Sequence, residues 1–364
     1  MSEIKRLIEE RKIPDVLKMN DGTAVTTAEQ LEKRRGEIKE LLCREVYGFP
    51  PAPPARVDSS SLGGDVSFYN WAGKAHHLRY SLSFEVGSGR FSFPVYYILP
   101  KAVKKPKVIV YISFDAGVPN KYLPVEEILD SGFGIAQMYY NDITVDMQDN
   151  FASGISPLVV DPAREPDDPG KIALWAYCAS RVLDFLIADG RCDTDNAIVA
   201  GHSRLGKTAL LAGMMDERFK FVVANDSGCA GDAITRGKTG EHIADILKTF
   251  PFWFCENYAK YADNEDALPF DQHFLLATIA PRYLVTGGAL DDTWADPFSQ
   301  YLSACTLEEV YALYGKKGLI HPDRLPKPGE TLHEGSVGFH LREGEHFLSR
   351  YDWGKYLAFI NAKS

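Results

Sequence analysis

The chain has 364 residues and a formal net charge of -10, with 45% hydrophobic and 25% charged residues. A chain of this length can bury a large core without a disulfide or metal staple. The negative charge argues against a general nucleic-acid or membrane-surface partner. No apolar stretch reaches the length of a membrane span. We therefore expect a globular protein without nucleic-acid or membrane partners.

Residues 1–57 predict an N-terminal helical arm. Thr26 or Thr27 can cap a helix that runs through residues 31–46, and the proline-rich stretch 49–54 ends it. The chain opens with a charged helix pattern and lacks the apolar core of a signal peptide. We expect either a cytoplasmic protein or a secreted or periplasmic one whose leader was removed.

The remaining residues, 58–364, predict a single α/β domain. Segments 77–85 and 90–99 alternate apolar and polar residues, as antiparallel strands do. Residues 172–188 have apolar side chains at helical spacing. Short continuous apolar runs, typical of strands buried on both faces, occur at 108–112, 133–139, 197–200, 221–224 and 283–286. Strands that alternate with helices indicate a mainly parallel central sheet flanked by helices.

Two long segments interrupt this alternation, at residues 141–171 and 231–280. Loops of this length in a compact domain are usually functional. Both follow predicted strands, so we expect them at the carboxyl ends of the sheet, where α/β proteins bind ligands. The second segment is predicted to be an insertion over the active site.

The sequence around Ser203 indicates a nucleophile. An apolar run ends at Gly201, Ser203 follows at a sharp turn, and a helix-forming segment begins at once. An α/β-hydrolase exposes its catalytic serine in this way. The second glycine of the motif, Gly206, lies three residues after Ser203, one position later than usual. An ordinary helix N-cap serine is the alternative interpretation.

A serine nucleophile needs a base, and in this fold the histidine comes last in the chain. His346 lies in a glycine-flanked loop before the predicted helix 351–360. His340 and His333 are competitors, although His340 lies in a strand-like segment and fits a packed structural histidine.

Two aspartates are candidates for the acid that orients this base. Asp226 follows the strand at 221–224, and Asp292 follows the strand that ends near residue 286. In most α/β-hydrolases the acid follows the later strand, which favours Asp292. Either aspartate could instead be a turn residue.

The segment from Gly201 to Lys207 resembles the nucleophile motif of the glucuronoyl esterases, carbohydrate esterase family fifteen. In that family an Arg follows the serine, and Gly-Lys follows the next residue. The resemblance covers roughly residues 105–360 and is greatest to the bacterial branch. Its further matching segments are 225–231, 239–241, 250–254, 268–273, 280–282, 292–297 and 338–346. It implies an α/β-hydrolase fold with three layers.

The resemblance also implies catalytic roles. Ser203 would be the nucleophile, His346 the base, and Arg204 a donor to the oxyanion. Many members have a Glu where Asp226 stands, whereas other bacterial members place an acid where Asp292 stands. The resemblance therefore favours Asp226 and leaves Asp292, or a role shared by both, as the alternative.

Four further residues match family positions near the sugar. Lys207, Glu241 and Trp294 would contact the glucuronic acid ring, and Gln272 is a weaker match. The residues alone would suggest a surface lysine, a helix-cap partner and a core tryptophan. A protein of net charge -10 that handles a uronic acid needs a local positive site, and Arg204 and Lys207 would provide it.

We expect a serine esterase that hydrolyses esters between (4-O-methyl-)glucuronic acid of xylan and lignin alcohols through an acyl-enzyme. Its partner would be a small-molecule or oligosaccharide glucuronate ester, and neither a metal nor an organic cofactor is implied. The first alternative is an esterase for acetyl-xylan or other acylated carbohydrates. The second is an inactive carbohydrate-binding relative.

Overall fold

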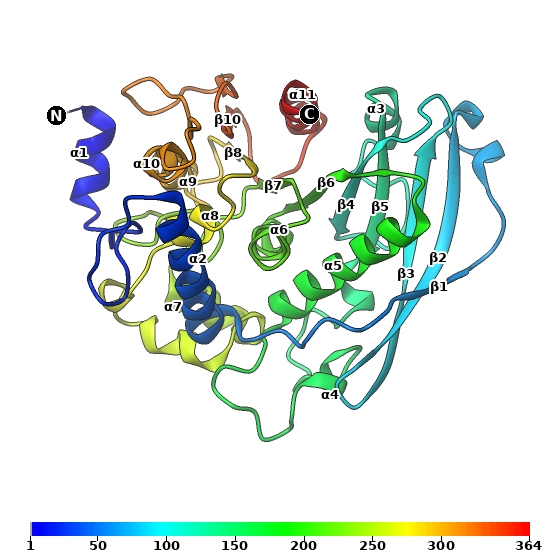
Figure 1. Ribbon diagram of the computed structural model, residues 1–364, viewed down its shortest axis with the longest axis horizontal. Coiled ribbons are helices and arrows are strands. Elements are labelled where there is room, and N and C mark those ends of the chain that lie inside the picture. Colours follow the sequence, from blue (N-terminus) through cyan, green and yellow to red (C-terminus); the bar gives the residue numbers. More distant parts are fainter. Residues whose placement is uncertain (1) are drawn as a thin grey trace.

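A single mixed sheet runs through the computed structural model, which describes residues 2–364 (Figure 1). Its strand order is β1-β2-β3-β5-β4-β6-β7-β8-β10-β9. The strands are β1 (Asp58–Ser61), β2 (Ala75–Val86), β3 (Gly89–Pro100), β4 (Lys107–Ser113), β5 (Phe133–Tyr139), β6 (Asp193–His202), β7 (Phe221–Asn225), β8 (Tyr283–Ala289), β9 (Thr331–Leu332) and β10 (Val337–Arg342).

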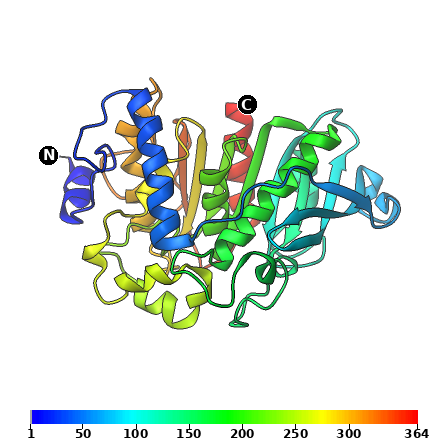
Figure 2. The same cartoon turned by 60° about the horizontal axis from the view of Figure 1, so that its bottom comes forward.

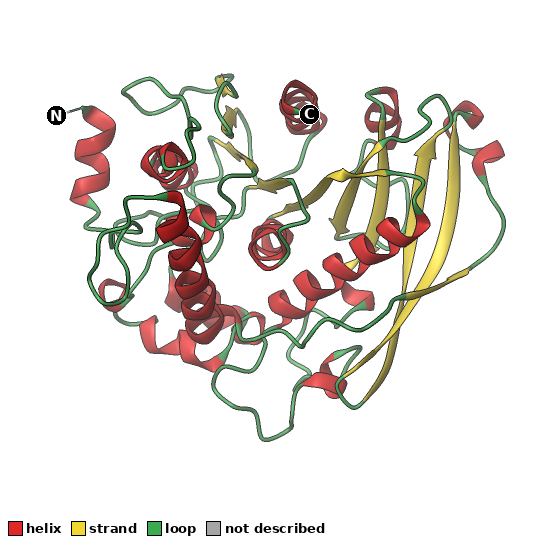
Figure 3. Cartoon of the chain, in the orientation of Figure 1, coloured by secondary structure: helices red, strands yellow, loops and turns green. Residues whose placement is uncertain are grey.

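The middle of the sheet is parallel and its edges are antiparallel. Strands β5, β4, β6, β7, β8 and β10 pair in parallel. The continuous apolar runs predicted all of these strands except β10. The long strands β2 and β3 pair antiparallel at one edge (Figure 3). This confirms the expected α/β-hydrolase fold, with a mainly parallel sheet between two helical layers.

Helices cover both faces of the sheet. The helices are α1 (Glu3–Glu10), α2 (Ala28–Leu42), α3 (Val125–Asp130), α4 (Ser156–Val159), α5 (Lys171–Asp189), α6 (Arg204–Met215), α7 (Ile243–Thr249), α8 (His273–Ala277), α9 (Pro297–Cys305), α10 (Leu307–Ala312) and α11 (Arg350–Lys363). Figure 1 shows α2, α5 and α6 on one side of the sheet and α3 and α11 on the other.

The alternation of side chains along a strand explains why the central strands are apolar throughout. Val110 and Ile112 of β4 join the core beneath α5 and α6, whereas Ile109 and Tyr111 join the core beneath α3 and α11. Strand β4 therefore contributes side chains to the hydrophobic cores on both faces of the sheet. No helix within residues 2–364 has the length and apolarity needed to cross a membrane.

The N-terminal arm packs onto the body of the protein. Thr27 caps α2 by accepting from the Gln30 backbone N–H, and the Gln30 side chain accepts from the Thr27 N–H. The helix ends at Leu42 and is followed by a π-helical turn to Tyr47, close to the predicted end at residue 46. Leu31 and Ile38 are fully buried in the core that also contains α5 and α6.

The two long segments lie together along one edge of the molecule. Figure 2 shows residues 231–280 beside the loop that precedes α5. The Asn257 N–H donates to Pro166 O at 3.0 Å, which joins the two segments directly. Both border the carboxyl ends of the parallel strands.

Candidate active site

Ser203 lies on a strained turn between β6 and α6. Its backbone has φ 58° and ψ -128°, a conformation that a non-glycine residue rarely adopts. A Cβ at Gly201 would lie 2.0 Å from Leu205 O, and one at Gly206 would lie 3.0 Å from Ser227 Cβ. Both glycines are therefore required by close backbone approach, which explains the displaced second glycine. The Ser203 side chain makes no capping hydrogen bond to α6. Its hydroxyl therefore does not act as an ordinary helix N-cap in this structure.

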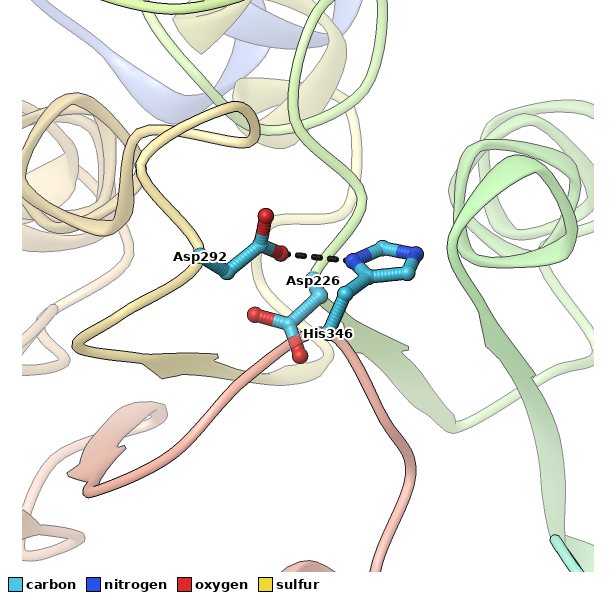
Figure 4. Close-up of side chains that lie close together, drawn as sticks. All are labelled: Asp226, Asp292 and His346. Carbon is cyan, nitrogen blue, oxygen red and sulfur yellow. Dashed lines mark hydrogen bonds and ion pairs between the residues drawn. The ribbon is translucent and has the colours of Figure 1, made fainter.

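His346 and Asp292 form a hydrogen-bonded pair beside this turn. His346 Nδ1 lies 2.6 Å from Asp292 Oδ2 (Figure 4). An ionised carboxylate only accepts, so the imidazole donates its Nδ1–H. The His346 side chain is 42% exposed and that of Asp292 is 5% exposed. Burial opposes ionisation of Asp292, but the hydrogen bond and charge of His346 lower its pKa.

Asp226 lies next to this pair without forming the hydrogen bond. Its Oδ1 accepts from the Ala289 N–H at 3.0 Å, and its Oδ2 lies 3.8 Å from the Arg342 guanidinium. Complete burial, followed by the charge of Asp292, raises the pKa of Asp226 well above its usual value. In this structure Asp292, and not the preferred Asp226, makes the hydrogen bond to His346, because the Asp226 carboxyl group lies at the end of β8 near Arg342.

The competing histidines lie elsewhere. His340 is fully buried on β10, with Nε2 2.9 Å from Asp352 Oδ1. Burial lowers the pKa of His333 to about 3, and its ring contacts that of His340. Neither residue lines the cavity at Ser203, so His346 is the histidine that the fold brings to the serine.

A cavity of about 310 Å³ opens at Ser203. It is lined by Ser203, Arg204, Lys207, Asp226, Ser227, Gly228, Glu241, Phe250, Trp253, Asp292, Trp294, Ala295 and His346. A larger groove of about 760 Å³ lies along residues 48–57 and α5, but its described lining contains no histidine. The chemistry of the lining, more than the volume, identifies the smaller cavity as the candidate site.

Arg204 is held at one wall of the cavity by groups from both long segments. Its guanidinium forms an ion pair with Asp146 and lies over the Trp253 ring at 4.5 Å. Trp253 Nε1 donates to the other oxygen of Asp146 at 2.6 Å. Sequence reasoning assigned no role to Asp146 or Trp253, although both belong to segments that it had singled out.

Lys207, Glu241 and Trp294 also line the cavity. Lys207 is buried one helical turn beyond Ser203, and its Nζ donates to Ser227 O at 2.6 Å. Burial lowers the pKa of Lys207, and Glu241 opposes that shift. The Glu241 N–H donates to Trp294 O at 2.9 Å, and Trp294 is 55% exposed.

Gln272 is the predicted site residue that the fold does not bring to this cavity. It precedes α8, is fully buried, and is not part of the cavity lining. The structure therefore gives no support to the expected contact with the sugar, because Gln272 lies in the interior at the start of α8.

The cluster of Asp226, Asp292 and His346 also has the composition of a metal site. Its ligand-type atoms lie within 4.8 Å of one another. However, the short hydrogen bond engages His346 Nδ1 with Asp292, and one of the two carboxyl groups favours its protonated form. This arrangement suits proton transfer at His346 better than cation binding.

A serine on a strained strand-to-helix turn, a histidine and a buried acid at the ends of parallel strands define the class as a serine hydrolase of the α/β-hydrolase fold. Comparison with known proteins identifies the family. The family model described as "Glucuronyl esterase, fungi" matches residues 86–315.

Similarity to individual proteins indicates the same family. The chain is 32% identical to carbohydrate esterase MZ0003 from an unknown prokaryotic organism, over 96% of this chain and 89% of the relative. It is 26% identical to the 4-O-methyl-glucuronoyl methylesterase of Schizophyllum commune, over 83% and 74%. The solved glucuronoyl esterase of Solibacter usitatus superposes with a TM-score of 0.87 at 34% identity, over 96% and 97%. The chain belongs to the glucuronoyl esterase family, carbohydrate esterase family 15.

Proposed function

We propose that this chain hydrolyses esters that join the carboxyl group of (4-O-methyl-)D-glucuronic acid on glucuronoxylan to an alcohol, including lignin alcohols. One observation carries the proposal. The cavity at Ser203 is also lined by Arg204, buried Lys207 and Glu241. The nucleophile therefore lies in the same cavity as the charged side chains proposed to bind the sugar. A neutral acetyl ester has less need of these cations.

In the first half of the reaction, His346 removes the Ser203 proton as the hydroxyl attacks the uronyl carbonyl carbon. Asp292 holds Nδ1–H, so Nε2 is the basic nitrogen. Figure 4 shows this second ring nitrogen directed away from Asp292. The imidazolium then gives its proton to the departing alcohol, leaving glucuronate bound to Ser203 as an ester.

Arg204 stabilises the oxyanion in both halves of the reaction. It is the first residue of α6, where a backbone N–H has no partner within the helix. Arg204 lines the cavity, and this N–H and the guanidinium are the donors that we assign to the oxyanion. One such donor is worth about 3–4 kcal/mol in related chemistry. Water activated by His346 then hydrolyses the acyl-enzyme and releases glucuronate.

Lys207, Glu241 and Trp294 form the proposed sugar site. The Lys207 ammonium and the Glu241 carboxylate can bond to ring hydroxyls, and the exposed Trp294 indole can cover an apolar ring face. The volume of about 310 Å³ lies at the small end of ligand pockets and suits a single sugar ring.

The test compares benzyl D-glucuronate, p-nitrophenyl acetate and acetylated xylan as substrates. The proposal predicts the highest kcat/KM on the glucuronate ester. Deacetylation of xylan without glucuronate turnover would establish the general carbohydrate acyl esterase instead. Glucuronate binding without turnover of any ester would identify a binding protein.

A further inference from the structure

Arg342 donates hydrogen bonds to the backbone on both sides of His346. It is the last residue of β10 and is 9% exposed. One terminal nitrogen donates to Glu345 O at 2.8 Å and also to Phe347 O, while the other donates to Glu343 O at 2.8 Å. The two residues that flank His346 are thus bound to a single guanidinium.

The guanidinium is itself anchored inside the protein. Arg342 Nε donates to Asp352 Oδ2 at 2.9 Å, and Asp352 is fully buried. The other oxygen of Asp352 lies 2.9 Å from His340 Nε2. Asp352 also accepts from the backbone N–H and hydroxyl of Ser349, which caps α11. The arginine therefore links β10, the His346 loop and the start of α11.

Little else holds the imidazole in place. The His346 side chain is 42% exposed, and its described contacts are the hydrogen bond to Asp292 and the His202 ring at 4.5 Å. Gly344, two residues earlier, has φ 93°, so the loop contains a residue with wide conformational freedom. The position of the imidazole consequently depends on the loop backbone, which Arg342 binds on both sides of His346 and which the Asp291 N–H binds at Gly344 O.

We propose that Arg342 is a positioning residue for catalysis, which clamps the Glu345 and Phe347 carbonyls so that His346 reaches both Asp292 and Ser203. This inference rests on the proposed function, in which His346 is the base. A misplacement of about 1 Å in a catalytic group can cost about 100-fold in rate. Arginine suits the task because its planar fork donates in several fixed directions, whereas a lysine ammonium is a compact point charge.

The experiment uses the full chain with Arg342→Lys, which retains the charge beside Asp226 but loses the fork. Arg350→Lys is the matched control. Its side chain is 80% exposed at the start of α11 and pairs only with Glu127 among its described ion pairs. We expect Arg342→Lys to lower kcat on benzyl glucuronate by about 10- to 100-fold with KM nearly unchanged, and Arg350→Lys to match wild type.

Two readouts report on His346 without any sugar substrate. One is the rate at which a fluorophosphonate labels Ser203. The other is the low-field proton resonance of the hydrogen bond between His346 and Asp292, assigned by its loss in His346→Gln. In Arg342→Lys, labelling should slow in parallel with kcat and the resonance should shift or broaden. Wild-type kcat, labelling and resonance in this variant would overturn the proposal.

If Arg342→Lys does not fold, Asp352→Asn decides the question. It keeps the side-chain shape but weakens the anchor of Arg342, so kcat should fall in the same direction with KM preserved. An unchanged kcat in folded Asp352→Asn would overturn the clamp. If wild type does not hydrolyse glucuronate esters, the proposed function fails, while the labelling and resonance still test the clamp.

Discussion

Replacement of Asp292 by Asn tests which of the two buried acids works with His346. In the transition state the imidazole becomes cationic, and the Asp292 carboxylate lies 2.6 Å from its Nδ1. Two opposite charges near 4 Å apart at an effective dielectric constant of about 20 attract by about 4 kcal/mol. Loss of this term corresponds to about 10³-fold in kcat. Asn can also donate to Nδ1, which would stabilise the wrong tautomer of the imidazole.

Asp226→Asn is the matched comparison. Burial and the charge of Asp292 favour the protonated, neutral form of Asp226, and Asn has nearly the same shape and charge as that form. Its oxygen can still accept from the Ala289 N–H. We expect kcat to fall by less than about 10-fold, within the range of one altered hydrogen bond. The assay is steady-state hydrolysis of benzyl glucuronate by both variants, with thermal denaturation as a folding check. An equal or larger loss in Asp226→Asn would refute the assignment of Asp292.

Three further changes test other parts of the structure. Lys207→Met should lower kcat/KM on benzyl glucuronate by about 10- to 100-fold, because a buried cation is lost, while p-nitrophenyl acetate hydrolysis stays near wild type. Equal losses on both substrates would contradict a role of Lys207 in binding the sugar. Gly201→Ala should lower the melting temperature severely, since the added Cβ would lie 2.0 Å from Leu205 O. The control Gly36→Ala should not lower it, because a Cβ there meets nothing within 4 Å. A Gly201→Ala protein as stable as wild type would refute the close packing at Gly201. Burial lowers the pKa of His273 to about 4 from 6.5, so the unfolded state takes up the proton first as the pH falls. Between pH 7 and pH 4, wild type should therefore lose about 3 kcal/mol of unfolding free energy relative to His273→Gln. Urea unfolding that shows the same pH dependence in both proteins would contradict this.

The sequence patterns predicted the central strands because burial on both faces leaves a strong local signal. The runs at 133–139 and 221–224 correspond to β5 and β7. The position of Ser203 was equally readable, since a strand, a small-residue turn and a helix follow one another along the chain. The displaced Gly206 could be explained only from the structure, because the reason is its close contact with Ser227 in the loop that follows β7.

The choice between Asp226 and Asp292 could not be made from the sequence. Each follows a strand at the same edge of the sheet, and the outcome depends on side-chain directions at the ends of β7 and β8. The contacts of Arg204 were hidden for a similar reason, since Asp146 and Trp253 are 107 positions apart and meet only in the fold. Gln272 matched a family segment, yet the packing of α8 decides where it points.

The most direct test of the central claim is the hydrolysis of benzyl glucuronate by wild type and Ser203→Ala, with glucuronate binding measured on both. We expect turnover by wild type and a loss of at least about 10³-fold in the variant. Glucuronate affinity should be retained, because Lys207 and Glu241 remain. Glucuronate ester hydrolysis that persists in Ser203→Ala would contradict the claim that this serine is the nucleophile.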